Sequence, residues 1–145
     1  DMMNQEALEV GATNSHFVNP HGLSDNDHYT TVYDMYLITN AAIKYSLFNE
    51  IIQMSSYTTV YTDRNGASKE VTVSSTNYYI QGTRQAPGGI TVLGGKTGTT
   101  NAAGHCLVLV SRDASSKPYI SVIMRADSRE ALYDQMTDLL SEIGN

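Results

Sequence analysis

Three apolar runs in the C-terminal half constrain the fold of this chain most strongly. They span residues 90–97, 105–112 and 119–125, and β-branched or aromatic side chains recur in each of them. The breaker Pro87-Gly88-Gly89 precedes the first run, and the turn-forming segment 113–118 separates the second from the third. Because only short turns connect the runs, they predict three consecutive antiparallel strands that form a meander.

A helix is predicted directly after the meander. Asp127, with Glu130 three residues later, is typical of an N-terminal cap, and Gly144 is placed to end the helix. Between these residues, apolar side chains recur at helical spacing: Leu132, Met136, Leu139, Leu140 and Ile143. We expect this amphipathic helix to cover one face of the small sheet.

The N-terminal half predicts further helices. Residues 1–10 resemble the last turns of a helix, and Gly11 is placed to stop it. Thr31, with Asp34 three residues on, predicts the start of a second helix, and Ser46 predicts the start of a short third one that runs to about residue 54.

A hairpin is predicted between these helices and the meander. Residues 57–62 and 69–73 are rich in strand-forming side chains, and the turn at 63–66 separates them. The expected class is therefore α+β: an antiparallel sheet of three-strand meander plus hairpin, covered by a C-terminal helix, with helices from the N-terminal half. Because no repeat or linker interrupts residues 1–145, we expect them to form one unit.

Composition excludes several classes of function. The formal net charge of -6 argues against a nucleic-acid partner, since the nine Lys and Arg residues are scattered. The four His residues lack metal-ligand spacing, so no metal site is expected, and no apolar stretch is long enough to span a membrane. Cys106 lies alone within an apolar strand and is interpreted as a buried structural thiol.

Lys96-Thr97-Gly98 is the motif with the clearest chemistry. Gly95-Lys96-Thr97 also matches the end of a phosphate-binding loop, but that motif requires Gly at position 90, where the chain has Ile90. On a strand that lines a cleft, Lys96 would supply a compact positive charge and Thr97 a hydroxyl donor. Gly98 would let a peptide approach the strand, and the N–H of Thr99 would face a developing oxyanion. The alternative is an edge strand with a solvated Lys.

Short landmarks in addition to this motif run along nearly the whole chain. In order, they are residues 14–23, with Asn-Pro-His-Gly-Leu at 19–23, then 28–31 with 34–35, 76–77, 94–100, 103–106 and 128–131. The ordered set resembles the low-molecular-mass D-alanyl-D-alanine carboxypeptidases, penicillin-binding serine peptidases of the S-x-x-K, S-x-N and K-T-G type. The resemblance implies a partial β-lactamase/transpeptidase-like domain.

The resemblance also implies a function. Members of this family are exported to the outer face of the cytoplasmic membrane, where they remove the terminal D-Ala from peptidoglycan stem peptides through an acylated Ser. They are acylated by β-lactams, and they need neither a metal nor an organic cofactor. We therefore expect a peptidoglycan peptide ending in D-Ala-D-Ala and β-lactams as partners, and a location in the cell envelope or outside the cell.

Two of the three family signatures are not found. No Ser has Lys three positions later, and the strings Ser24-Asp25-Asn26 and Ser75-Thr76-Asn77 fall at places where the family has other landmarks. In the family, the S-x-x-K and S-x-N segments precede the region that this chain resembles. Residues 1–145 are thus interpreted as the C-terminal part of the catalytic domain, which we expect to be inactive alone.

Two further site residues follow from the resemblance. Arg129 matches the Arg that helps to hold the terminal carboxylate of the substrate, a task suited to its paired donors. His21 matches a position at the mouth of the cleft. The alternatives are an exposed Arg in the first turn of a helix and a loop His with structural hydrogen bonds.

Two other functions remain open from the sequence. The first is a non-catalytic half-domain that binds a partner or associates with itself through exposed sheet edge and apolar surface. The second is a relative of the β-lactamases, which share Lys-Thr-Gly but lack the Asn-Pro-His-Gly-Leu landmark.

Overall fold

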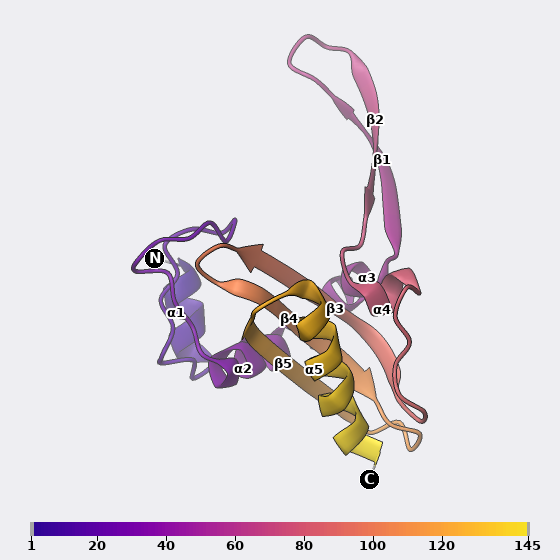
Figure 1. Cartoon of the computed structure of the whole chain (residues 1–145). Helices are drawn as coiled ribbons and strands as arrows, with labels where there is room; N and C mark the ends of the chain where they lie inside the picture. Colours follow the sequence, from indigo (N-terminus) through magenta and orange to yellow (C-terminus); the bar gives the residue numbers. More distant parts are fainter. Residues whose placement is uncertain (1, 145) are drawn as a thin grey trace.

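The computed structural model describes residues 2–144 and contains helices and two antiparallel sheets, which confirms the expected α+β class (Figure 1). The helices are α1 (Met2–Glu9), α2 (Val32–Ala42), α3 (Ser46–Gln53), α4 (Tyr78–Gln81), α5 (Arg129–Ser141) and the 3-10 turn η1 (Glu142–Gly144). The strands are β1 (Ser56–Thr62), β2 (Ser68–Ser74), β3 (Thr91–Thr100), β4 (Gly104–Arg112) and β5 (Pro118–Ala126).

The predicted meander forms the main sheet, with strand order β3-β4-β5. Lys96 on β3 lies opposite Val108 on β4, and Leu109 on β4 lies opposite Ser121 on β5. The first strand continues beyond the expected run to Thr100, so it carries the whole Lys-Thr-Gly segment in extended conformation. Within the described residues, β3 pairs only with β4, which leaves its other edge without a strand partner.

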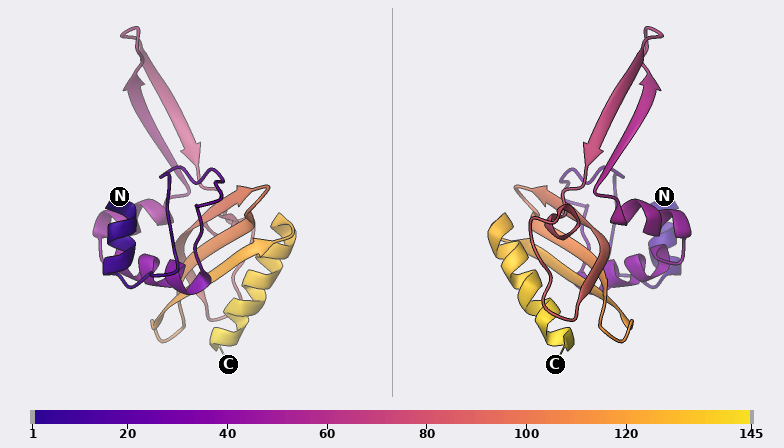
Figure 2. Two further views of the ribbon diagram at one scale, coloured as in Figure 1. Left: turned by 90° about the vertical axis from the view of Figure 1, so that its left-hand side faces the viewer. Right: turned by 90° about the vertical axis from the view of Figure 1, so that its right-hand side faces the viewer.

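Helices cover both faces of this sheet (Figure 2). Helix α5 packs against β4 and β5 on one face, as expected, and α2 and α3 contact β5 and β3 on the other. Apolar side chains between the sheet and α5 make the core: Ile90, Leu107, Leu109, Ala126, Leu132, Tyr133, Met136 and Leu140. The sheet therefore has a closely packed support behind β4 and β5.

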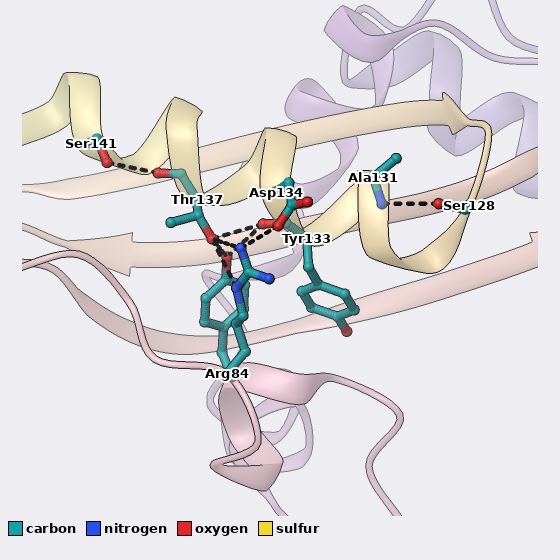
Figure 3. Close-up of polar contacts among 8 residues, drawn as sticks. Arg84, Ser128, Ala131, Tyr133, Asp134, Thr137 and Ser141 are labelled. Carbon is teal, nitrogen blue, oxygen red and sulfur yellow. Dashed lines mark hydrogen bonds and ion pairs between the residues drawn. The ribbon is translucent and has the colours of Figure 1, made fainter.

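The helix caps agree only partly with the sequence predictions. The Thr31 hydroxyl accepts the N–H of Asp34 and caps α2, as predicted. At α5, Ser128 and not Asp127 is the cap, and its Oγ accepts the N–H of Ala131 at 3.0 Å (Figure 3). Both residues suit an N-cap, and the structure places Ser128 in the extended conformation directly before the first helical residue.

Two other boundaries also differ from expectation. Tyr45 and not Ser46 occupies the N-cap position of α3, and it makes no side-chain cap hydrogen bond. The predicted C-terminal helix ends as an α-helix at Ser141 and continues to Gly144 only as the tighter turn η1.

The predicted hairpin is present as a separate two-stranded sheet that projects away from the main sheet (Figures 1 and 2). Its register runs from Ser56 opposite Ser74 to Thr62 opposite Ser68. At the turn, Lys69 Nζ lies 3.0 Å from a carboxylate oxygen of Asp63. The contact with Lys69, together with the backbone N–H groups of Asn65 and Ala67, holds the pKa of Asp63 below its usual value.

Helix α4 was not predicted from the sequence. The side chain of Asn77 caps it by accepting the N–H of Tyr79 at 3.1 Å, and Gly82 ends it in the left-handed conformation with φ of 77°. A helix of one turn has no periodic pattern to find, because two successive turns are needed to show a face.

Candidate functional site

Strand β3 presents Lys96, Thr97 and Gly98 at its free edge. Its glycines differ in how much space surrounds them. A Cβ atom on Gly95 would lie 2.3 Å from the Val108 carbonyl oxygen, and one on Gly94 would lie 2.6 Å from the Ile52 side chain. These two glycines are therefore required for packing. A Cβ atom on Gly98 would meet no heavy atom within 4 Å. The space beside Gly98 is open to a group from outside the chain.

A cleft of about 840 Å³ lies along this edge. It is formed by the 19–23 loop, β3, α4 and the start of α5, so segments from both ends of the chain meet there. All six site residues predicted from the sequence line it: Lys96, Thr97, Gly98, Thr99, Arg129 and His21. Among the described residues, no Asp or Glu lines this cleft, although the chain carries a net charge of -6. A cleft with two cations and no carboxylate favours an anionic ligand.

Thr97 is connected to the segment that precedes α4. Its hydroxyl oxygen lies 2.5 Å from that of Thr76, so one of the two hydroxyls donates to the other. Lys96 Nζ donates to the carbonyl oxygen of Thr97 on its own strand. In the sequence, Thr76 belongs to the landmark at residues 76–77, and the structure places it beside the motif.

Arg129 lies in the first turn of α5 and is held by Tyr78. Its Nη1 donates to the Tyr78 hydroxyl at 3.1 Å, and the guanidinium carbon lies 5.8 Å from the centre of the same ring. This hydrogen bond raises the pKa of Arg129, which stays fully charged. A cation gains nothing from the helix dipole at this end of a helix, so the dipole does not account for Arg129.

Tyr133 on α5 supports both of these arrangements. Its ring stacks on that of Tyr78, with centroids 4.6 Å apart and planes 7° apart. Its hydroxyl accepts the N–H of Tyr78 at 2.9 Å and donates to the carbonyl oxygen of Thr76 at 3.3 Å. Only 2% of Tyr133 is exposed, and this burial raises the pKa of its hydroxyl. The buried Tyr133 side chain thus positions both Thr76, which contacts Thr97, and Tyr78, which contacts Arg129.

Further polar contacts fasten the segment after α4 to α5 (Figure 3). Arg84 donates to Asp134 at 2.7 Å and to the Thr137 hydroxyl at 3.1 Å. The hydroxyl of Tyr79 lies 2.8 Å from the same Thr137 oxygen. The sequence does not predict this network, because its partners are 50 or more positions apart in the chain.

His21 lies in a loop that its neighbours fix in place. Its Nδ1 accepts the N–H of Leu23 at 3.2 Å, and Asn19 both accepts the N–H of Gly22 and donates to the Leu23 carbonyl. The φ of Gly22 is 76°, a conformation that favours glycine. His21 therefore has the structural hydrogen bond of the alternative interpretation, and it also lines the cleft.

The two S-x-N strings have local partners. The Ser24 hydroxyl lies 2.8 Å from that of Thr100, which joins the loop to the end of β3. The Ser75 hydroxyl accepts the N–H of Asn77 at 3.2 Å, just before α4. Both contacts are consistent with structural tasks for these two serines.

Other classes of site receive no support from residues 2–144. Within that part of the chain, no three His, Cys, Asp or Glu residues are grouped so that they could hold a metal ion. None of the helices described there is long and apolar enough to cross a membrane.

Comparisons with known proteins agree with this geometry. Residues 1–128 match a family described as D-alanyl-D-alanine carboxypeptidase. The D-alanyl-D-alanine carboxypeptidase DacF of Bacillus subtilis is 31% identical over 140 residues, which are 95% of this chain and 33% of that protein. The Streptomyces K15 DD-transpeptidase structure superimposes with a TM-score of 0.83 at 26% identity and covers 96% of this chain.

A solved D-alanyl-D-alanine carboxypeptidase from Mycobacterium tuberculosis is similar as well, with a TM-score of 0.76 and 27% identity. This chain covers 51% of the Streptomyces structure and 50% of the mycobacterial one. It therefore spans from about a third to about half of the length of these relatives.

Proposed function

Because the chain belongs to the D-alanyl-D-alanine carboxypeptidase family, we propose that it forms the Lys-Thr-Gly wall of a serine-type D-Ala-D-Ala carboxypeptidase of peptidoglycan maturation. The proposed substrate is a stem peptide that ends in D-Ala-D-Ala, and β-lactams would occupy the same cleft. The observation that carries the proposal is the position of Lys96, Thr97, Thr99 and Arg129 along one cleft, which no carboxylate of residues 2–144 lines.

Each residue has a proposed task at one end of the scissile bond. The substrate backbone would lie along the free edge of β3 beside Gly98, where no side chain obstructs it. Arg129 and the Thr97 hydroxyl would bind the terminal carboxylate, and the Thr99 N–H would donate to the oxyanion. Lys96 would favour the ionised groups of the reaction nearby. These donors bind and orient the substrate but form no covalent bond with it.

The nucleophile is proposed to come from a Ser-x-x-Lys segment that is not part of this sequence. No Ser in the chain has Lys three positions later, and Ser24 and Ser75 have the local partners described above. In the assembled enzyme, the Ser oxygen would attack the carbonyl of the penultimate D-Ala, the peptide bond would break, and D-Ala would leave with the proton. Water would then hydrolyse the ester. The isolated chain is proposed to be inactive, to need no metal or cofactor, and to derive from an exported protein that works at the cell envelope.

Self-association is a second candidate function, and one observation favours it. An apolar groove of about 700 Å³ lies among α1, α2 and α3, lined by residues that include Met3, Phe17, Met35, Ile38 and Phe48. Such a surface is typical of a contact with another protein surface. Size-exclusion chromatography with light scattering tests this, because a monomer at every concentration would exclude self-association.

Intact-mass measurement after incubation with a labelled penicillin tests the main proposal. The chain alone is compared with a longer protein in which a Ser-x-x-Lys segment precedes it. An adduct only in the longer protein, together with release of D-Ala from an acyl-D-Ala-D-Ala peptide, would support the proposed division of tasks. An adduct on the chain alone would overturn it and would direct attention to Ser24 and Ser75.

A further inference from the structure

Tyr78 places a hydroxyl group in the cleft beside Arg129. The residue begins α4, and its side chain lines the same cleft as Lys96, Thr97 and Arg129. The hydroxyl oxygen accepts Nη1–H of Arg129 at 3.1 Å, which is the one hydrogen bond of this hydroxyl among residues 2–144. A phenol also has one O–H to donate. That proton therefore remains available for an acceptor in the cleft.

Contacts with Tyr133 fix the position of the Tyr78 hydroxyl. The ring of Tyr78 lies parallel to that of the buried Tyr133 at 4.6 Å, and its backbone N–H donates to the Tyr133 hydroxyl. Arg84 fastens the segment after α4 to Asp134 and Thr137 on α5. Because ring and backbone are both held, the Tyr78 hydroxyl needs little ordering when a ligand binds, which lowers the entropic cost of binding.

The charges of the cleft favour an anionic ligand, which would accept this proton. Lys96 and Arg129 bring positive charge to the cleft, and no Asp or Glu among the described residues lines it. A carboxylate is planar and has two oxygens that can each accept more than one hydrogen bond. Arg129 uses Nη1 on Tyr78, and its other N–H groups remain for one carboxylate oxygen. The second carboxylate oxygen would then be left for the O–H of Tyr78.

We propose that Tyr78 is a further substrate-binding residue, whose hydroxyl accepts from Arg129 and donates to the terminal carboxylate of the peptide. The inference rests on the proposed function and adds a contact to the same site. Its consequence is selectivity: the Tyr78 hydroxyl distinguishes a peptide with a free C-terminal carboxylate from one that ends in an amide.

NMR titration of this chain with N-acetyl-D-Ala-D-Ala and with its C-terminal amide tests the contact. Tyr78→Phe removes only the hydroxyl and keeps the ring on Tyr133. Its affinity for the acid is expected to fall about 10-fold, the typical effect of losing a hydrogen bond to a charged group. Its affinity for the amide is expected to stay that of the parent chain. Tyr61→Phe, on the projecting hairpin, is the matched control and should change neither affinity.

The outcomes separate this inference from the proposed function. If Tyr78→Phe binds the acid as tightly as the parent does while Arg129→Gln binds it more weakly, the Tyr78 contact is wrong and the proposed function stands. If the parent does not prefer the acid to the amide, or if Arg129→Gln has no effect, the proposed carboxylate site fails and the Tyr78 contact fails with it.

A second comparison applies if Tyr78→Phe lowers the thermal midpoint. Tyr133→Phe removes the neighbouring hydroxyl and leaves that of Tyr78 in place. It therefore shows how much selectivity is lost when Tyr78 is held less firmly but keeps its hydroxyl. A larger loss of selectivity for the acid in Tyr78→Phe than in Tyr133→Phe would support the contact. Equal losses in the two variants would overturn it.

Discussion

Tyr133 lies parallel to Tyr78, with ring centroids 4.6 Å apart, and its hydroxyl accepts the backbone N–H of Tyr78 at 2.9 Å. The two residues are 55 positions apart in the chain. The pair joins α4 to α5. Through it, Tyr133 holds both Tyr78, which contacts Arg129, and Thr76, which contacts Thr97. The stack therefore determines the shape of one wall of the candidate site.

Substitution of Tyr133 should cost stability in two distinguishable steps. Tyr133→Phe leaves the Tyr78 N–H and the Thr76 carbonyl without their partner, and we expect a loss of about 1–3 kcal/mol in the free energy of unfolding. Tyr133→Ala also opens a cavity beside Tyr78, and we expect a total loss of about 3–5 kcal/mol. Urea denaturation measures both. A Tyr133→Phe variant as stable as the parent would contradict the supporting role, and Tyr61→Phe is the control.

The glycines of β3 should separate folding from function. Gly95→Ala would bring Cβ to 2.3 Å from the Val108 carbonyl oxygen, so we expect a loss of more than about 2 kcal/mol or no folded chain. Gly98→Ala meets no heavy atom within 4 Å, and we expect a change in stability below about 0.5 kcal/mol. Circular dichroism during urea denaturation checks both variants.

The methyl group of Gly98→Ala should nevertheless weaken binding, because it occupies the open side of the strand edge. N-acetyl-D-Ala-D-Ala titrated against this variant is expected to bind more weakly than to the parent chain. Unchanged binding would show that the peptide does not pass over Gly98.

Alkaline pH should destabilise the chain through the buried Tyr133 and the partly buried Tyr79. Burial raises the pKa of Tyr79 and, in the same way, that of Tyr133. The folded state favours the protonated phenols. Their contribution to the free energy of unfolding is therefore fully present below the ordinary tyrosine pKa of about 10, and it is lost as the pH rises through the folded pKa values. The urea midpoint should therefore be lower at about pH 11 than at about pH 8.

Tyr79→Phe should reduce this difference, because it removes one of the two groups whose pKa differs between the folded and unfolded states. The hydroxyl of Tyr79 also contacts Thr137, so the variant is compared with itself at the two pH values and not with the parent at one. If the urea midpoint of the variant falls between the two pH values by as much as that of the parent does, Tyr79 is not the responsible group.

The fold could largely be predicted from the sequence because its signals are local. The runs that became β3, β4 and β5 each have strand-forming side chains between turn formers, and the adjacent strands pair with each other. Local signals were ambiguous where two good capping residues are neighbours, so that Ser128 was missed in favour of Asp127. Helix α4 has only one turn and no pattern of its own.

The candidate site could be predicted only in part. Lys96 to Thr99 form a contiguous motif, and the resemblance supplied Arg129 from a second landmark. The link between the two landmarks was missed, because it passes through Tyr78 and Tyr133, which only the packing of α4 on α5 brings together. No local pattern distinguishes these two tyrosines from the other eight of the chain.

Two lysines of the chain should differ sharply in their effect on acylation. In a longer protein that supplies a Ser-x-x-Lys segment, Lys96→Ala should slow acylation by a labelled penicillin about 100-fold or more, because it removes a fixed charge next to the reacting groups. Lys69→Ala should leave the rate unchanged, since Lys69 pairs with Asp63 at the tip of the hairpin. The two variants lose the same side chain and the same charge, so the protein's composition and net charge are matched. Equal rates in the two variants would therefore contradict the position of Lys96 at the reacting centre and, with it, the assignment of β3 as the wall of the site.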